Sequence, residues 1–324
     1  MDDRDLDERA VLADDLQQRG DPLGELVALQ LAREALPDTA HPMRKKAIEN
    51  RIATYLDQHH DALFGPLAPH VQRLSLPDLF DPAIDILRWR GGFVEALFVQ
   101  RRLKDLQLSD AVRMIASVPM FRFAHEITIG MGDLSAAFGE LAKLPALRTL
   151  AIDQWKRVLP KLEHAFVEFD DNARALLARL EHFNGGSVRY SKFESSSLRS
   201  VRMWPSYSEP PPYFDAVLPE ARRLELHHFE FDPRLLERYP KIEQLRFSVR
   251  EIRRDALEAL VASPRLAQLT EIELGYLLDD AALGLLARNG DRLQHVTKLV
   301  LRGQFSPDAK AAARARLPAI ADLA

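Results

Sequence analysis

A six-residue pattern recurs along the chain and constrains its fold more than any other feature. The pattern L-x-x-L-x-L, with apolar residues at the L positions, occurs at 124–129, 147–152, 198–203, 221–226, 242–247, 269–274 and 296–301. Successive copies start 23, 51, 23, 21, 27 and 27 residues apart, and a period of about 20–29 residues is typical of leucine-rich repeats. Each repeat is a short strand with a return segment that buries its apolar face against its neighbours. The pattern therefore predicts an α/β solenoid with parallel strands.

The segments between and before these copies fit the same architecture. The gap of 51 residues is close to two repeats, so a degenerate copy is expected near 166–180, and earlier copies are expected at 71–76 and 93–98. Helical patterns occupy 109–121, 132–144, 253–266 and 279–289, and several of them begin with Ser or Asp, which are favoured as N-caps. We expect a horseshoe over residues 66–324, with a parallel sheet and outer helices.

The repeats resemble bacterial leucine-rich repeats of the ribonuclease-inhibitor-like, helix-bearing kind. That family places Asn or Cys in the turn after each strand, where the side chain bonds to the turn backbone. This sequence has other residues at all seven of those positions. The resemblance therefore implies an irregular leucine-rich-repeat array.

The first 65 residues have a different, helical pattern. Residues 19–21 spell Arg-Gly-Asp, a tripeptide that adhesion receptors bind, but they also suit a joint between two helices. Gly20 suits the positive φ that is common after a helix, Asp21 suits an N-cap, and Pro22 suits the first helical position. Gln30 lies on the apolar face of the second helix, where we expect it to bond to buried backbone. With a third helix predicted within 41–64, residues 1–65 are predicted to form a small helical domain.

Three stretches near the N-terminus also resemble a known family. They are "LADDLQQRGDPLGELVALQ" (12–30), "HHDALFGPLAP" (59–69) and "WRGGFVEALFV" (89–99). They resemble the bacterial repeat-companion domains of the myxobacterial and planctomycete type. That resemblance implies a domain that accompanies repeat arrays, and it implies no catalytic role.

Composition excludes several classes of site and location. The absence of cysteine excludes disulfides, thiolate metal sites and cysteine nucleophiles. The acidic start and the lack of an apolar run of about 18 residues predict no secretory signal and no membrane span, and we expect a cytoplasmic protein. The formal net charge is −4, with 8 basic and 14 acidic residues in 1–65. No region is concentrated in positive charge, so nucleic acid is not an expected partner.

Enzymatic and metal-binding motifs are also missing from the sequence. It contains no G-x-S-x-G, P-loop, H-E-x-x-H or kinase signature, and the pairs Gly91-Gly92 and Gly185-Gly186 lack the flanks of a phosphate loop. The pairs His59-His60 and His227-His228 are adjacent residues whose side chains point apart on a helix or a strand, so neither pair chelates a metal well. We expect no enzyme activity, no metal and no cofactor.

The alternation of side chains along a strand identifies the residues of the concave face. If the last two template positions point into the core, the residues that flank them point to the opposite side. The lining predicted in this way is Asp153, Arg202, Trp204, Arg223, Glu225, His227, Gln244, Arg246, Ser248, Glu271, Glu273, Lys298 and Arg302. Two loops, predicted at 184–197 and 205–214, adjoin this face, and the second supplies Tyr207 and Tyr213 as apolar anchors.

A mixed-charge face with Trp and Arg suits a folded protein partner. The sequence therefore predicts a noncatalytic scaffold, monomeric when unbound, that binds another protein on the concave face and the adjoining loops. A regulatory inhibitor, or an effector that is cut by a protease within 184–197 and acts on a cognate bacterial enzyme, is an open alternative.

Overall fold

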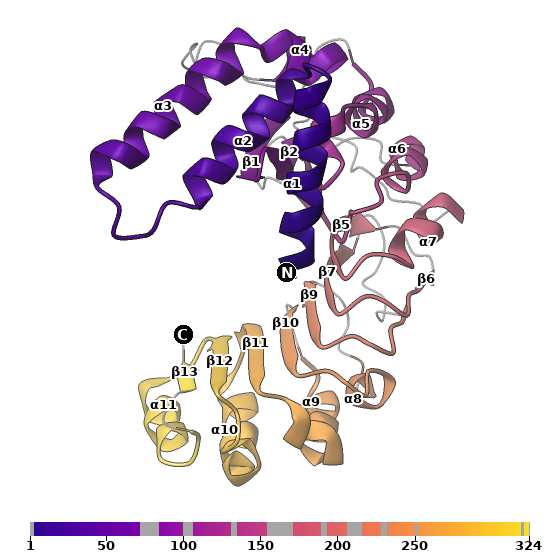
Figure 1. The fold of residues 1–324 in the computed structure, drawn as a ribbon. Helices are drawn as coiled ribbons and strands as arrows, with labels where there is room; N and C mark the ends of the chain where they lie inside the picture. Colours follow the sequence, from indigo (N-terminus) through magenta and orange to yellow (C-terminus); the bar gives the residue numbers. More distant parts are fainter. Residues whose placement is uncertain are drawn as a thin grey trace. The chain divides into compact units, whose positions relative to one another are not determined.

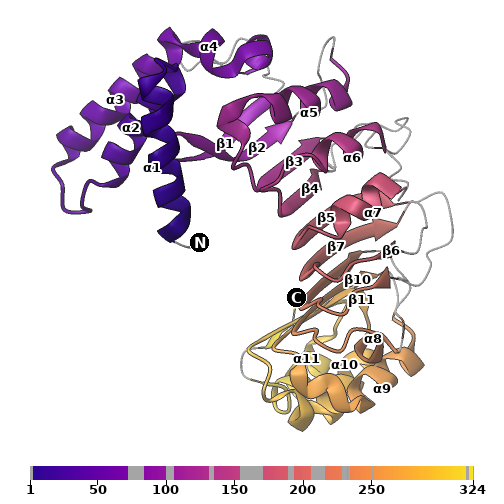
Figure 2. The same ribbon diagram turned by 45° about the vertical axis from the view of Figure 1, so that its right-hand side comes forward.

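A computed structural model of the chain describes residues 3–71, 84–99, 106–130, 135–153, 171–188, 193–205, 216–227, 232, 234–249, 252–318 and 321–323. The chain separates into two compact units, Met1–Lys156 and Arg157–Ala324. Each unit combines helices with a mostly parallel sheet (Figures 1 and 2). The predicted boundary between residues 65 and 66 is a different division, and it stays a prediction. Among the described residues, no helix has the length and apolar character needed to cross a membrane.

The first unit begins with helices. They are α1 (Asp3–Gln18), α2 (Pro22–Glu34), α3 (Pro42–Gln58) and α4 (His60–Phe64), followed by the 3-10 helix η1 (Gly65–His70). The joint between α1 and α2 has the predicted form: Gly20 has φ of 70°, Pro22 opens α2, and the Asp21 carboxylate accepts a hydrogen bond of 2.9 Å from the Leu23 amide. Each residue of the joint therefore has a local structural role.

A β-hairpin follows, and its turn lies against α2. Strand β1 (Ile84–Arg90) pairs antiparallel with β2 (Phe93–Val99), and the turn residues Gly91 and Gly92 have φ of 52° and 82°. The Gly92 amide donates a 2.9 Å hydrogen bond to the Gln30 side chain, which confirms the expected bond to buried backbone. The strand expected at 93–98 is present. Of the copy expected at 71–76, Val71 forms a parallel bridge to Ile84, and the other residues lie outside the described ones.

The remaining described elements of the first unit alternate between helix and strand. They are α5 (Leu108–Ser117), the 3-10 helix η2 (Pro119–Phe121), β3 (Glu126–Gly130), α6 (Ser135–Leu141) and β4 (Thr149–Asp153). Strands β2, β3 and β4 are neighbours and run parallel. The spacing of the template thus produces parallel strands from its first two copies.

The second unit carries a longer parallel sheet. Its described strands in spatial order are β5 (His182–Val188), β7 (Ser200–Pro205), β9 (Arg223–His227), β10 (Gln244–Val249), β11 (Glu271–Leu278), β12 (Lys298–Gly303) and β13 (Ala321–Leu323). A separate pair joins β6 (Phe193–Glu194) and β8 (Ala216–Val217). Its helices are α7 (Asp171–Leu177), α8 (Leu235–Arg238), α9 (Arg254–Ala262), α10 (Asp280–Arg288) and α11 (Pro307–Arg314), with the 3-10 helices η3 (Pro264–Gln268) and η4 (Gly290–Leu293). Helices α9, α10 and α11 lie along one side of β10, β11 and β12 (Figure 1).

The apolar template positions of the second unit form its core. Adjacent parallel strands place Leu224 beside both Val201 and Leu245. The template residues on β7, β9, β10 and β11 are all buried: Val201, Met203, Leu224, Leu226, Leu245, Phe247, Ile272 and Leu274. The prediction of buried leucines on parallel strands is therefore confirmed, and the chain has a repeated α/β sheet architecture.

Two predicted features of this unit are corrected. The described part of 166–180 holds α7, whereas the extra strand is β5, which starts at His182. The loop predicted at 184–197 is therefore strand as far as Val188, and strand again at β6. The template falls on residues 180–185 here, with Gly185 at its last apolar position. A Cβ on Gly185 would come within 2.6 Å of the buried Phe183 ring, so this ring occupies the space of the missing side chain. The predicted loop at 205–214 lies outside the described residues except Pro205, which ends β7.

Candidate protein-binding face

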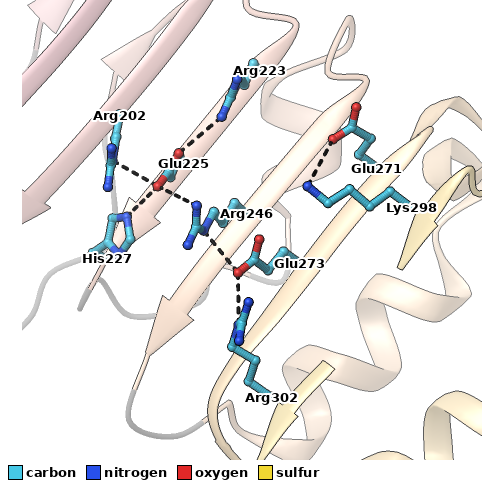
Figure 3. A network of polar contacts seen from close by, with 9 residues as sticks. All are labelled: Arg202, Arg223, Glu225, His227, Arg246, Glu271, Glu273, Lys298 and Arg302. Carbon is cyan, nitrogen blue, oxygen red and sulfur yellow. Dashed lines mark hydrogen bonds and ion pairs between the residues drawn. The ribbon is translucent and has the colours of Figure 1, made fainter. Parts of the chain in front are cut away.

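The polar residues that alternate with the core leucines share one face of the second unit's sheet. We call this set the charged face; it comprises Arg202, Arg223, Glu225, His227, Gln244, Arg246, Ser248, Glu271, Glu273, Lys298 and Arg302. The strand register places Arg202, Glu225, Arg246 and Glu273 side by side on β7, β9, β10 and β11. Charge therefore alternates from strand to strand, which is the favourable arrangement for cross-strand neighbours. Figure 3 shows nine of these residues: seven are linked through Glu225 and Glu273, and Glu271 and Lys298 form a separate pair.

Glu225 is the centre of this network. Its Oε1 atom lies 2.9 Å from Arg202 Nε, 2.8 Å from His227 Nε2 and 3.3 Å from Arg246 Nη1. Its Oε2 atom lies 3.5 Å from Arg223 Nη2. One buried carboxylate thus holds three guanidinium groups and an imidazole that come from three neighbouring strands (Figure 3).

Glu273 and Glu271 extend the network toward β12. Glu273 Oε1 lies 3.2 Å from Arg246 Nε and 3.1 Å from Arg302 Nε, so Arg246 links the two carboxylate centres. Glu271 accepts a 3.0 Å hydrogen bond from the Gln244 side chain and lies 4.0 Å from Lys298 Nζ. The contacts therefore run continuously from β7 to β12 through β9, β10 and β11.

The two signs of charge are exposed to different extents. The Arg202 and Arg246 side chains are 40% and 39% exposed and that of Arg223 is 54% exposed, whereas the Glu225 side chain is 3% exposed. Glu273 is 12% exposed beside Arg302 at 51%. Around these two glutamates, the charged face thus presents its cations outward and keeps its carboxylates beneath them.

The surroundings of Glu225 keep its side chain ionised. Burial raises the pKa of the Glu225 carboxyl group. The hydrogen bond from His227 and the charges of Arg202 and Arg246 lower this pKa by more than burial raises it, so it lies below its usual value. A carboxylate at neutral pH is therefore a fixed part of the network, and it orients the guanidinium groups around it.

Four of the predicted site residues are not brought into this network by the described structure. Asp153 ends β4 in the first unit, and its side chain lies outside the described residues. Trp204 lies in β7 with its backbone opposite Ser187, and its side chain is likewise outside the description. Tyr207 and Tyr213 lie wholly outside the described residues. The other eleven predicted residues all lie on the charged face.

The first unit contains a second buried carboxylate with arginine partners, which the sequence analysis did not identify. Glu95 on β2 lies 3.0 Å from Arg9 Nη2 on α1 and 3.4 Å from Arg88 Nε on β1. Arg9 also donates a 2.7 Å hydrogen bond to the Arg90 carbonyl, and its side chain is as deeply buried as that of Glu95. The sequence signal for this buried carboxylate is Glu95 itself, a charged residue within the apolar run "FVEALF". Because both Arg9 and Glu95 are covered, this pair fastens α1 to the hairpin.

The described structure offers no arrangement for a metal ion. Within the described ranges, no three His, Cys, Asp or Glu side chains are grouped so that they could hold one. The His227 ring contacts Glu225, and His228 lies outside the described residues.

Comparison with known proteins adds little. No family model matches the chain, and no curated protein is significantly similar to it. The crystal structure of a protein from Bacteroides fragilis, a Northeast Structural Genomics Consortium target, is similar with a TM-score of 0.49 and 17% sequence identity, over 68% of this chain and 70% of that chain. A similarity of this extent gives no information about function.

Proposed function

We propose that this protein is a noncatalytic scaffold of the leucine-rich-repeat type that binds another protein on the charged face. The observation that carries the proposal is the outward presentation of the arginines over buried carboxylates. Arginine is enriched at the centres of protein interfaces, because its planar group binds carboxylates through two parallel hydrogen bonds. The N-terminal helices fit the proposed role of a repeat-companion domain, which accompanies such an array.

Stability alone is a poor explanation for the network. Exposed ion pairs contribute only about 0–1 kcal/mol each, and a buried ion pair is often no more stabilising than apolar residues of the same volume. The fold nevertheless places Glu225 under three guanidinium groups, at the cost of removing its carboxylate from water. A role in binding accounts for this cost, because the buried Glu225 holds the arginines in place before a partner arrives.

Photo-crosslinking in the native host tests the proposal. A benzophenone amino acid would replace Ser248, on the charged face, or Glu258, an exposed residue of α9, in two otherwise identical chains. We expect a discrete crosslinked protein with the Ser248 replacement and none with the Glu258 replacement. Crosslinking from Glu258 alone, or from neither position, would contradict a partner on the charged face.

A further inference from the structure

The composition of the charged face also specifies the chemistry of its occupant. Among the nine residues of Figure 3, five are cationic and three are carboxylates. The surplus positive charge faces outward, because the two glutamates that contact most of the arginines are the least exposed charged groups of the network. We propose that the occupant is an extended acidic segment of a partner protein, whose carboxylates bind the guanidinium groups of Arg202, Arg223 and Arg246. This inference rests on the proposed function and deepens it.

Glu225 prepares the three arginines for an incoming anion. An exposed arginine loses rotamer freedom when it binds, and this loss weakens binding. Here Arg202, Arg223 and Arg246 are already held at 2.9, 3.5 and 3.3 Å from one carboxylate group. A guanidinium carries five N–H donors on three nitrogen atoms. Arg223 contacts Glu225 through Nη2, and Arg246 contacts Glu225 and Glu273 through Nη1 and Nε, so both have N–H donors beyond those contacts for an incoming carboxylate. The site is therefore built before the acidic segment arrives.

The dimensions of the charged face suit a short extended peptide. Cationic residues occur on β7, β9, β10 and β12, which span four strand spacings of the sheet. At about 4.8 Å per spacing, the row is about 19 Å long, and an extended peptide with a rise of about 3.3 Å per residue covers it with about six residues. A segment of about six residues, with carboxylates opposite the cationic strands, thus spans the whole row.

Charge distribution favours an acidic peptide over nucleic acid. A phosphate backbone carries a dense, uniform negative charge and requires an equally concentrated positive surface. Between the cations of β10 and β12, however, β11 presents Glu271, whose side chain is 38% exposed, and Glu273. A peptide places uncharged residues opposite these carboxylates, whereas a nucleic acid strand cannot omit a phosphate.

Fluorescence anisotropy with a labelled hexaglutamate peptide tests the inference on the 324-residue chain. We expect saturable binding that weakens with added salt, and at least a tenfold loss of affinity in Arg202→Gln combined with Arg246→Gln. A second variant, Lys298→Gln combined with Arg302→Gln, leaves the contacts of Glu225 intact and should lose at least threefold. Circular dichroism shows whether each variant is folded.

The matched control is Arg254→Gln combined with Arg288→Gln, which removes the same charge from exposed positions on α9 and α10. Its affinity should equal that of the wild type, and hexaglutamine should not bind. The inference is wrong if the wild type does not bind hexaglutamate, or if the control and charged-face variants lose affinity equally. Tighter binding of heptathymidylate, which carries six phosphates, would assign the face to nucleic acid instead.

Two further outcomes separate this inference from the proposed function. If Ser248 crosslinks a partner while hexaglutamate does not bind, the scaffold proposal stands and the acidic occupant is wrong. If sedimentation velocity shows self-association that the Arg202→Gln and Arg246→Gln substitutions abolish, the occupant is a second copy of this chain, and the inference of a separate acidic partner is wrong.

Discussion

At the scale of single residues, Asp21 shows why an adhesion-type tripeptide occurs in this chain. Its carboxylate caps α2, and Gly20 before it has the positive φ of a helix terminus. Replacing Asp21 by Ala should lower the free energy of unfolding by about 1 kcal/mol, because the Leu23 amide loses its acceptor. Asp21→Asn keeps an acceptor oxygen and is the control. Urea denaturation measures both, and equal stability of Asp21→Ala and wild type would contradict the capping role.

Glu225 is the residue whose ionisation matters most to the charged face. Its pKa in the folded protein lies below its usual value, so its ionised form stabilises the fold at pH values above the unfolded-state pKa of about 4.3. That contribution is lost as the pH falls through the folded-state pKa. Glu225→Gln should therefore cost roughly 2–3 kcal/mol at pH 7, less than a fully buried pair because its arginine partners are partly exposed.

Denaturation of wild type and Glu225→Gln between pH 7 and pH 3 checks this sign. The difference in free energy of unfolding should be largest at neutral pH and should shrink as the pH falls from the unfolded-state pKa of about 4.3 toward the lower folded-state pKa. The other carboxyl groups titrate in both proteins, so the difference isolates Glu225. A difference that stays constant over this range would show that the charge of Glu225 does not stabilise the fold.

At the scale of elements, the contact between α2 and the β1–β2 turn depends on Gly92. A Cβ at this position would lie 2.2 Å from Val27 Cγ2 and 2.5 Å from Val27 Cα, and the φ of 82° is unfavourable for other residues. Gly92→Ala should therefore destabilise the protein by about 3 kcal/mol or more, from overpacking together with backbone strain. Gly20 also has positive φ, but a Cβ there meets nothing within 4 Å, so Gly20→Ala should cost only about 1 kcal/mol. Thermal unfolding compares them, and equal losses would contradict the close packing.

The elements also show how far the sequence predicts this fold. All seven template copies are parallel strands, because alternating leucines both define a strand and bury one of its faces. The template does not predict strand β5, because Gly185 occupies the last apolar position, next to the Phe183 ring. The sequence predicts strand β2 at 93–98 but not its antiparallel partner β1, because that pairing depends on the Gly91-Gly92 turn and on contacts with α2, which are not local in sequence.

At the scale of the whole molecule, the sequence predicts which residues form the candidate site but not which of them are buried or in contact. Alternation along each strand places Arg202, Glu225 and Arg246 on one face. Which of them is buried depends on the register between strands, and no single repeat contains that information. The central position of Glu225 therefore appears only in the structure.

The N-terminal helices affect how binding experiments should be designed. Arg9 and Gln30 reach from α1 and α2 to Glu95 and Gly92 in the hairpin. Deleting residues 1–65 would remove the acceptor of the Gly92 amide and the Arg9 partner of Glu95, which would keep only its longer contact with Arg88 among those described. Losing the partners of buried polar groups is destabilising. A loss of binding after such a deletion could therefore result either from unfolding or from the loss of a binding surface. Substitutions of exposed residues on the charged face are the cleaner test.

The most direct measurement is titration calorimetry between the 324-residue chain and the partner isolated by crosslinking from Ser248. Trp204→Ala combined with Arg246→Ala should weaken this complex at least tenfold, because Trp and Arg are the residues most often found at interface hot spots. Lys46→Ala combined with Arg254→Ala, both on exposed helical surfaces, should leave the affinity unchanged. Full affinity in the folded Trp204→Ala and Arg246→Ala variant would show that the partner does not bind the charged face.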